Sequence, residues 1–119
     1  MLYSRHDFVE LVRTQPKELQ STLIAIIWYA SKGNPNEQNG NRYGLLQIDL
    51  NQAKLRGYDR QPTWLLDPAL NIQFGAQLLS DIGLLEFCGR ELAPQLPNIM
   101  ALAQFLDSEQ EKTPVETGV

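Results

Sequence analysis

Residues 65–76 read LLDPALNIQFGA and contain the clearest helix start in the chain. The carboxylate of Asp67 suits the capping position, where it accepts hydrogen bonds from free backbone N–H groups, and Pro68 suits the first helical position. Gly83 is a typical helix end. Between them, apolar residues recur at fourfold spacing: Leu70, Phe74, Leu78 and Ile82. We therefore predict an amphipathic helix that begins at Pro68 and ends at Gly83.

Four more helices are predicted on either side of this one. Their expected ranges are Ser4 to just before Pro16, Pro16 to about Ser31, about Leu50 to Arg56, and about Pro97 to Glu109. Residues 32–42, KGNPNEQNGNR, contain too much Gly, Asn and Pro for the interior of a helix or strand. The apolar run Gly44 to Ile48 is too short to assign. The pattern predicts an all-α fold with at most a minimal β element in region 33–48.

Chain length and composition favour a single globular domain. The chain has 119 residues, of which 43% are hydrophobic and 20% charged. We expect one helical domain at residues 1–109 and a flexible polar tail at residues 110–119. Cys88 is the only cysteine, so no intrachain disulfide can form, and we expect its thiol to be buried.

Charge and segment patterns exclude several classes of function. The net charge is -4 and the isoelectric point about 4.9, which gives no support to nucleic-acid binding. No apolar run is long enough to span a membrane. His6 is the only histidine, so we expect no metal site and no cofactor. The polar first ten residues do not look like a signal peptide, so we expect a cytoplasmic or virion-associated protein or a fragment of an exported one.

Four motifs, in this order and spacing, resemble a known family. Residues 26–31 read IIWYAS, Asn34-Pro35 follows, residues 43–48 read YGLLQI, and then comes the stretch at residues 65–76. Together they resemble the lysozyme-like domain of goose-type lysozymes and lytic transglycosylases (SLT domains). That family shows a helix ending in Glu-Ser, then Asn-Pro, Gly-Leu-Met-Gln-Ile and Leu-x-Asp-Pro-x-x-Asn-Ile-x-x-Gly-Ala. The resemblance covers residues 19–79 and implies a lysozyme-like helical fold directed at peptidoglycan or chito-oligosaccharide.

The chain departs from the family at two places that matter for chemistry. The family's helix-terminal Glu protonates the glycosidic oxygen, and this chain has Ala30 at that position. A methyl group cannot deliver a proton. Near the C-terminus, the family's Ala-Tyr-Asn-Ala-Gly stretch corresponds to residues 101–107, where Phe105 lacks the phenolic hydroxyl and Leu106 replaces the amide. The resemblance implies that Ser31, Tyr43 and Gln47 contact sugar.

Other side chains near these motifs have simpler expected roles. Glu37 and Asp49 are the carboxylates that could replace the missing acid. We expect Glu37 to be a solvated loop residue and Asp49 to cap the next helix. Aromatic residues can line a sugar cleft, but we expect Trp28 in the core because its neighbours are apolar.

Three interpretations remain open from the sequence. The chain is an inactive, glycan-binding or structural domain, for instance in a phage particle or a secretion or injection assembly. Alternatively, it is an active transglycosylase or muramidase whose acid at position 30 has been replaced in this sequence. In a third interpretation, the motifs reflect only a buried turn and an ordinary helix start. The chain is then a helical protein–protein interaction module that does not bind glycan.

Overall fold

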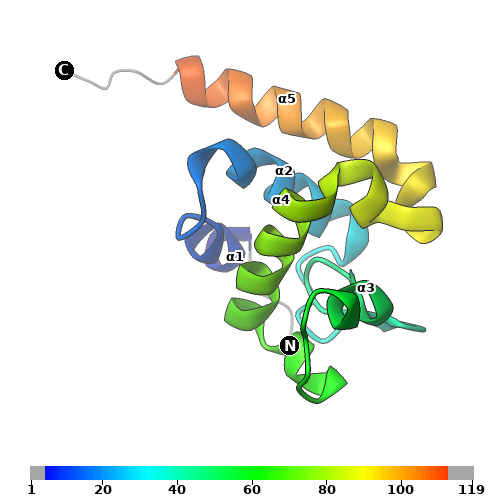
Figure 1. The fold of residues 1–119 in the computed structure, drawn as a ribbon. Helices are drawn as coiled ribbons and strands as arrows, with labels where there is room; N and C mark the ends of the chain where they lie inside the picture. The colour runs from blue at the N-terminus through cyan, green and yellow to red at the C-terminus, as the bar shows by residue number, and fades with distance from the viewer. Residues whose placement is uncertain (1–4, 113–119) are drawn as a thin grey trace.

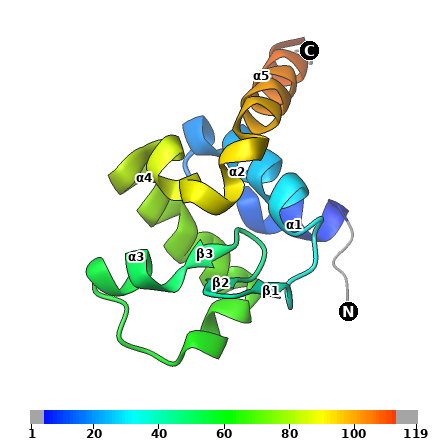
Figure 2. The ribbon, with the colours of Figure 1, turned by 90° about the vertical axis from the view of Figure 1, so that its right-hand side faces the viewer.

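The computed structural model describes residues 5–112, with side chains described for residues 8–109. The elements in chain order are α1 (Arg5–Val12), α2 (Lys17–Ala30), β1 (Gln38–Asn39), β2 (Arg42–Tyr43), β3 (Ile48–Asp49), α3 (Leu50–Leu55), the 3-10 helix η1 (Pro62–Leu66), α4 (Pro68–Leu92), the 3-10 helix η2 (Ala93–Gln95) and α5 (Leu96–Lys112). The fold is mainly α-helical, as predicted. Helix α5 lies at one end of the molecule, and the strands with α3 lie at the other (Figure 1, Figure 2).

The small sheet includes residues that we expected to be a loop: β1 lies within residues 32–42, and β2 begins at Arg42. Strands β1, β2 and β3 form an antiparallel sheet in that order, in which Gln38 pairs with Tyr43 and Arg42 pairs with Asp49. Each strand has two residues, too few for an alternating pattern to be visible in the sequence. The expected minimal β element in region 33–48 is confirmed.

The helix starts follow the capping signals. The carboxylate of Asp49 accepts hydrogen bonds from the backbone N–H groups of Asn51 and Gln52, at 2.8 and 3.1 Å, and so caps α3. Asp67 caps α4 in the same way, because it accepts from the backbone N–H of Leu70 at 2.9 Å. Both capping predictions are confirmed.

The predicted helix end at Gly83 is confirmed for the first part of α4, which consists of two helical parts joined across a kink. The backbone does leave the helical conformation there, with φ 85° and ψ 164°, but helical turns resume and continue to Leu92 with a second break at Gly89. Phe87, Cys88 and Leu92 are buried in this second part, so packing against the core maintains it. A glycine that ends a helix carries no information about the structure of the residues beyond it, so the sequence did not predict this segment.

The last helix is slightly longer than expected. It begins at Leu96, one residue before Pro97, and continues to Lys112, into the segment predicted to be a tail. Residues 113–119, the predicted helix start at Ser4 and the side chain of His6 lie outside the described residues and side chains.

Asn71 connects α4 to the strand region. Its side chain is fully buried; Nδ2 donates to the backbone oxygens of Tyr43 and Leu65, at 2.9 and 2.7 Å, and Oδ1 accepts from the backbone N–H of Leu46 at 2.9 Å. One amide thus satisfies backbone groups on two other segments. The motif at residues 65–76 and the motif at residues 43–48 are therefore parts of one hydrogen-bonded unit.

Two motif glycines are required because these segments approach closely. Gly44 has a φ of 78°, and a Cβ there would lie 2.5 Å from the backbone oxygen of Leu65 and closer still to Asn71. A Cβ at Gly75 would overlap a methyl group of Leu46. Larger residues at either position would separate α4 from the strand region.

We predict that Asn71→Leu lowers the free energy of unfolding by about 3 kcal/mol, because a side chain of similar size leaves three buried backbone groups without partners. Asn98→Leu, on the exposed surface of α5, is the matched control and should change it by less than about 0.5 kcal/mol. Urea denaturation followed by circular dichroism measures both. Equal effects of the two substitutions would show that Asn71 does not hold these segments together.

Cys88 is buried, as predicted, and burial raises the pKa of its thiol, while the charge of Arg42 partly opposes the shift. A raised pKa reduces the thiolate fraction at a given pH, and the thiolate is the reactive form. We predict that the folded protein reacts with a disulfide reagent such as DTNB far more slowly at pH 8 than the urea-unfolded chain. Equal rates would contradict the buried position.

Candidate functional site

Position 30 lies where α2 ends and the chain enters the loop toward the strands. Ala30 is the last residue of the helix, and it is partly buried against the core. The backbone N–H of Ser31 still donates to the oxygen of Ile27 at 3.0 Å, so the helical pattern holds through this point. The structure therefore fixes the direction in which a side chain at position 30 leaves the helix.

Ser31 links the end of α2 to the strand region. Its hydroxyl is buried and donates to the backbone oxygen of Leu45 at 2.8 Å, while it accepts from the backbone N–H of Gly33 at 3.3 Å. Its polar capacity is used within the protein. Ser31 thus sets the distance between the helix end and the apolar run at residues 44–48.

Gln47 organises the opposite side of the same loop. Its side chain is only 2% exposed; Nε2 donates to the backbone oxygens of Glu37 and Gly44, at 3.0 and 2.9 Å, and Oε1 accepts from Nδ2 of Asn39 at 3.0 Å. The backbone of Gln47 has a φ of 52°, a conformation uncommon for residues other than glycine. These bonds hold the strand hairpin and the loop before it in one arrangement.

The structure brings Ser31, Tyr43 and Gln47 together around the loop after position 30, mostly in the interior. Tyr43 is buried, with 9% of its surface exposed. Direct contact of Ser31 or Gln47 with a sugar would require their internal hydrogen bonds to be exchanged. That contact stays a prediction, whereas the observed bonds give both residues a positioning role.

The two alternative carboxylates have different environments. Asp49 is occupied in capping α3. Glu37 is partly buried, and its two carboxylate oxygens accept from Nδ2 of Asn34 at 3.3 Å and Nδ2 of Asn39 at 2.9 Å. Glu37 is therefore a partly buried, hydrogen-bonded loop residue and not the fully solvated one that we expected.

Arg42 has a structural role that was not predicted from the sequence. Its guanidinium is buried and donates to the backbone oxygens of Gln47 at 2.9 Å and Cys88 at 2.7 Å, and it forms an ion pair with Glu91 at 3.2 Å. The pKa of the Glu91 carboxyl is lowered by a hydrogen bond from the backbone N–H of Glu91 and by the positive charge of Arg42. Arg42 thus ties the sheet to the second part of α4.

The contact between Arg42 and α4 requires a glycine that is distant from Arg42 in the sequence. Gly89 has a φ of 58°, and a Cβ there would lie 2.7 Å from a guanidinium nitrogen of Arg42. The residues are separated by 47 positions, so no local pattern could pair them.

Two tryptophans, Trp28 on α2 and Trp64 on η1, are about half exposed. The prediction that Trp28 lies in the core was wrong, because 47% of its surface is exposed. Trp28 follows Ile24 by one helical turn, and both residues face a shallow apolar cavity of about 250 Å³ that Phe105 and Leu106 of α5 also line. Trp64 is also half exposed, with the guanidinium of Arg60 5.4 Å from its ring centre.

The described part of the chain contains neither a membrane-spanning helix nor a metal cluster. None of its helices combines the length and apolar character that crossing a bilayer requires. Its side chains contain no group of three or more His, Cys, Asp or Glu residues that could hold a metal ion.

The helices, the small antiparallel sheet and the joined motifs define a lysozyme-like helical domain. A family model, the transglycosylase SLT domain, matches residues 10–87, about two thirds of the chain. The chain belongs to this family, which makes it a lytic-transglycosylase or lysozyme-like domain related to peptidoglycan. No curated protein and no solved structure matches it significantly.

We predict that Ser31→Ala lowers the free energy of unfolding by about 1–2 kcal/mol, because the oxygen of Leu45 and the N–H of Gly33 lose a buried partner. Ser108→Ala, on the exposed side of α5, should change it by less than about 0.5 kcal/mol. Chemical denaturation of both variants measures the difference. A Ser31→Ala variant as stable as the control would contradict the positioning role.

Proposed function

We propose that this chain binds peptidoglycan glycan strands without cleaving them. One observation carries the proposal: Ala30 is the terminal residue of α2, the position at which the sequence resemblance puts the family's proton-donating Glu. Cleavage of a glycosidic bond needs a carboxylic acid placed beside the leaving oxygen. The methyl group of Ala30 leaves the reaction without that acid.

The framework around position 30 supports a retained binding function. Ser31 and Gln47 keep their buried hydrogen bonds, and Asn71 joins the two family motifs. These bonds hold the loop that follows α2 in a defined position. The carboxylate of Glu37 is engaged by two asparagine amides, which favours a role in loop structure over proton transfer.

We further propose that the domain acts within a larger wall-directed assembly, such as a phage particle or a secretion or injection device. The net charge of -4 supports this, because it provides no electrostatic attraction to an anionic cell wall. A domain held in an assembly needs no such attraction. The exposed Trp28 and Phe105 are apolar surface of the kind that partner proteins cover.

The proposal predicts that the unaltered chain, with Ala30, sediments with purified peptidoglycan sacculi but releases no soluble muropeptides. Ala30→Glu supplies a carboxylic acid at the end of α2, and we expect it to raise muropeptide release by about a hundredfold or more over background. Ala30→Gln is the matched control, since its amide has a similar size and no acid proton, and it should remain inactive. Chromatography of the soluble fraction measures release.

Two results would contradict the proposal. Muropeptide release by the unaltered chain at the level of Ala30→Glu would mean that another group supplies the proton. Failure of the unaltered chain to sediment with sacculi would remove glycan binding and favour a protein-interaction module instead.

A further inference from the structure

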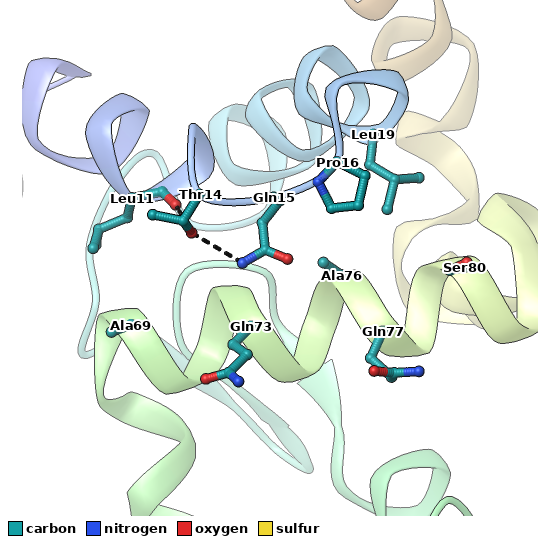
Figure 3. Close-up of a pocket in the computed structure, with 10 residues that line it drawn as sticks. All are labelled: Leu11, Thr14, Gln15, Pro16, Leu19, Ala69, Gln73, Ala76, Gln77 and Ser80. Carbon is teal, nitrogen blue, oxygen red and sulfur yellow. Dashed lines mark hydrogen bonds between the residues drawn. The ribbon is translucent and has the colours of Figure 1, made fainter.

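A cavity of about 660 Å³ lies between α4 and the connection from α1 to α2 (Figure 3). Its volume is within the range of small-molecule sites, about 300–1,000 Å³. Leu11, Pro16 and Leu19 form an apolar wall on the side of α1 and α2. The polar lining comes from five side chains: Thr14, Gln15, Gln73, Gln77 and Ser80.

The polar side chains of this lining share one property: they are uncharged. Among the side chains that the structure describes, none that lines the cavity is charged, although 20% of the chain is. Each polar side chain is a hydroxyl or a primary amide, which can both donate and accept hydrogen bonds. Such a lining suits a neutral ligand with hydroxyl and amide groups and a less polar face. It provides no counter-charge for an ion or for the termini of a free peptide.

Gln15 is held in position before any ligand binds. Its Nε2 donates to the hydroxyl of Thr14 at 3.0 Å, and that hydroxyl donates to the backbone oxygen of Leu11 at 2.7 Å. The side chain of Gln20 donates to the backbone oxygen of Gln15 at 2.8 Å. Figure 3 shows the amide of Gln15 directed toward α4. A side chain fixed in this way loses little conformational entropy on binding.

Gln73 and Gln77 form the outer rim on α4. In Figure 3 their amides lie along the near edge of the helix and point away from Gln15. Both also line a neighbouring cavity of about 430 Å³, together with Tyr58 and Phe74. A ligand longer than one sugar ring can therefore extend over this rim.

We propose that this cavity is a second binding site for N-acetylhexosamine units, separate from position 30. Pro16 and Leu19 lie at the start of α2, whereas Ala30 is its last residue. The 14 residues of the helix put the two sites about 20 Å apart. The inference rests on the proposed function in that both sites bind the same polymer. Contact at two places increases the affinity for long glycans over short ones.

The test follows backbone amide chemical shifts of the ¹⁵N-labelled chain during titration with tetra-N-acetylchitotetraose. We expect saturable shifts at Gln15, Gln77 and Ser80. Ala69→Trp places an indole at an exposed position that lines the cavity and should weaken the affinity read from these signals by about tenfold or more. Ala101→Trp, on the exposed side of α5, is the matched control and should leave it unchanged.

A smaller substitution in the cavity tests the same binding site independently. Gln15→Ala removes the fixed amide and should weaken the same affinity by about fivefold to tenfold, whereas Gln104→Ala on α5 should not. The dispersion of the amide spectrum reports folding in every variant. Absence of saturable shifts at the cavity, or shifts unaffected by Ala69→Trp, would overturn the inference. Shifts there with the neutral peptide N-acetyl-trialanine amide, and none with the sugar, would also overturn it.

The signals of Ala30 and Tyr43 separate this inference from the proposed function. Shifts at the cavity alone support the second site and count against glycan binding at position 30. Shifts at Ala30 and Tyr43 alone support glycan binding at position 30 and count against the second site.

Discussion

The buried amide of Asn71 is the interaction on which the arrangement of this domain depends. It satisfies backbone groups of the apolar run at residues 43–48 and of η1 at once, which a purely apolar core could not do. Because a buried amide has fixed donor and acceptor positions, it sets orientation as well as distance. Gly44 and Gly75 then allow the approach that these bonds require.

Further buried hydrogen bonds extend this unit in two directions. Ser31 connects it to the end of α2, and Arg42 connects the sheet to the second part of α4 through backbone oxygens freed near Gly89. The loop between α2 and the strands is therefore fixed at both ends. The side chain of Gln47 also donates to the backbone oxygens of Glu37, inside the loop, and Gly44. A loop rich in Asn and Gly can be ordered in this way even though its backbone forms little regular structure.

The sequence predicted most of the helices because their signals are local. Asp49 and Asp67 are capping residues that act within three positions, and the structure confirms both. The contacts of Arg42 with Cys88 and Glu91 could not be predicted, since they join residues more than 40 positions apart. Trp28 was misplaced for a related reason: apolar neighbours along a helix do not reveal which face lacks a covering element. For the candidate site, the location stays a prediction from the motifs, whereas the internal bonding of Ser31 and Gln47 required the structure.

The inward bonding of Ser31, Gln47 and Asn71 has an evolutionary consequence. These three residues lie in the motifs that resemble the family, and they use their side-chain hydrogen bonds inside the fold, so selection for folding alone would favour keeping them. Ala30 is only partly buried, and its methyl group forms no hydrogen bond, so folding constrains position 30 less than it constrains these three. A substitution at position 30 can therefore change the chemical group at the end of α2 while the hydrogen bonds that hold the framework stay intact.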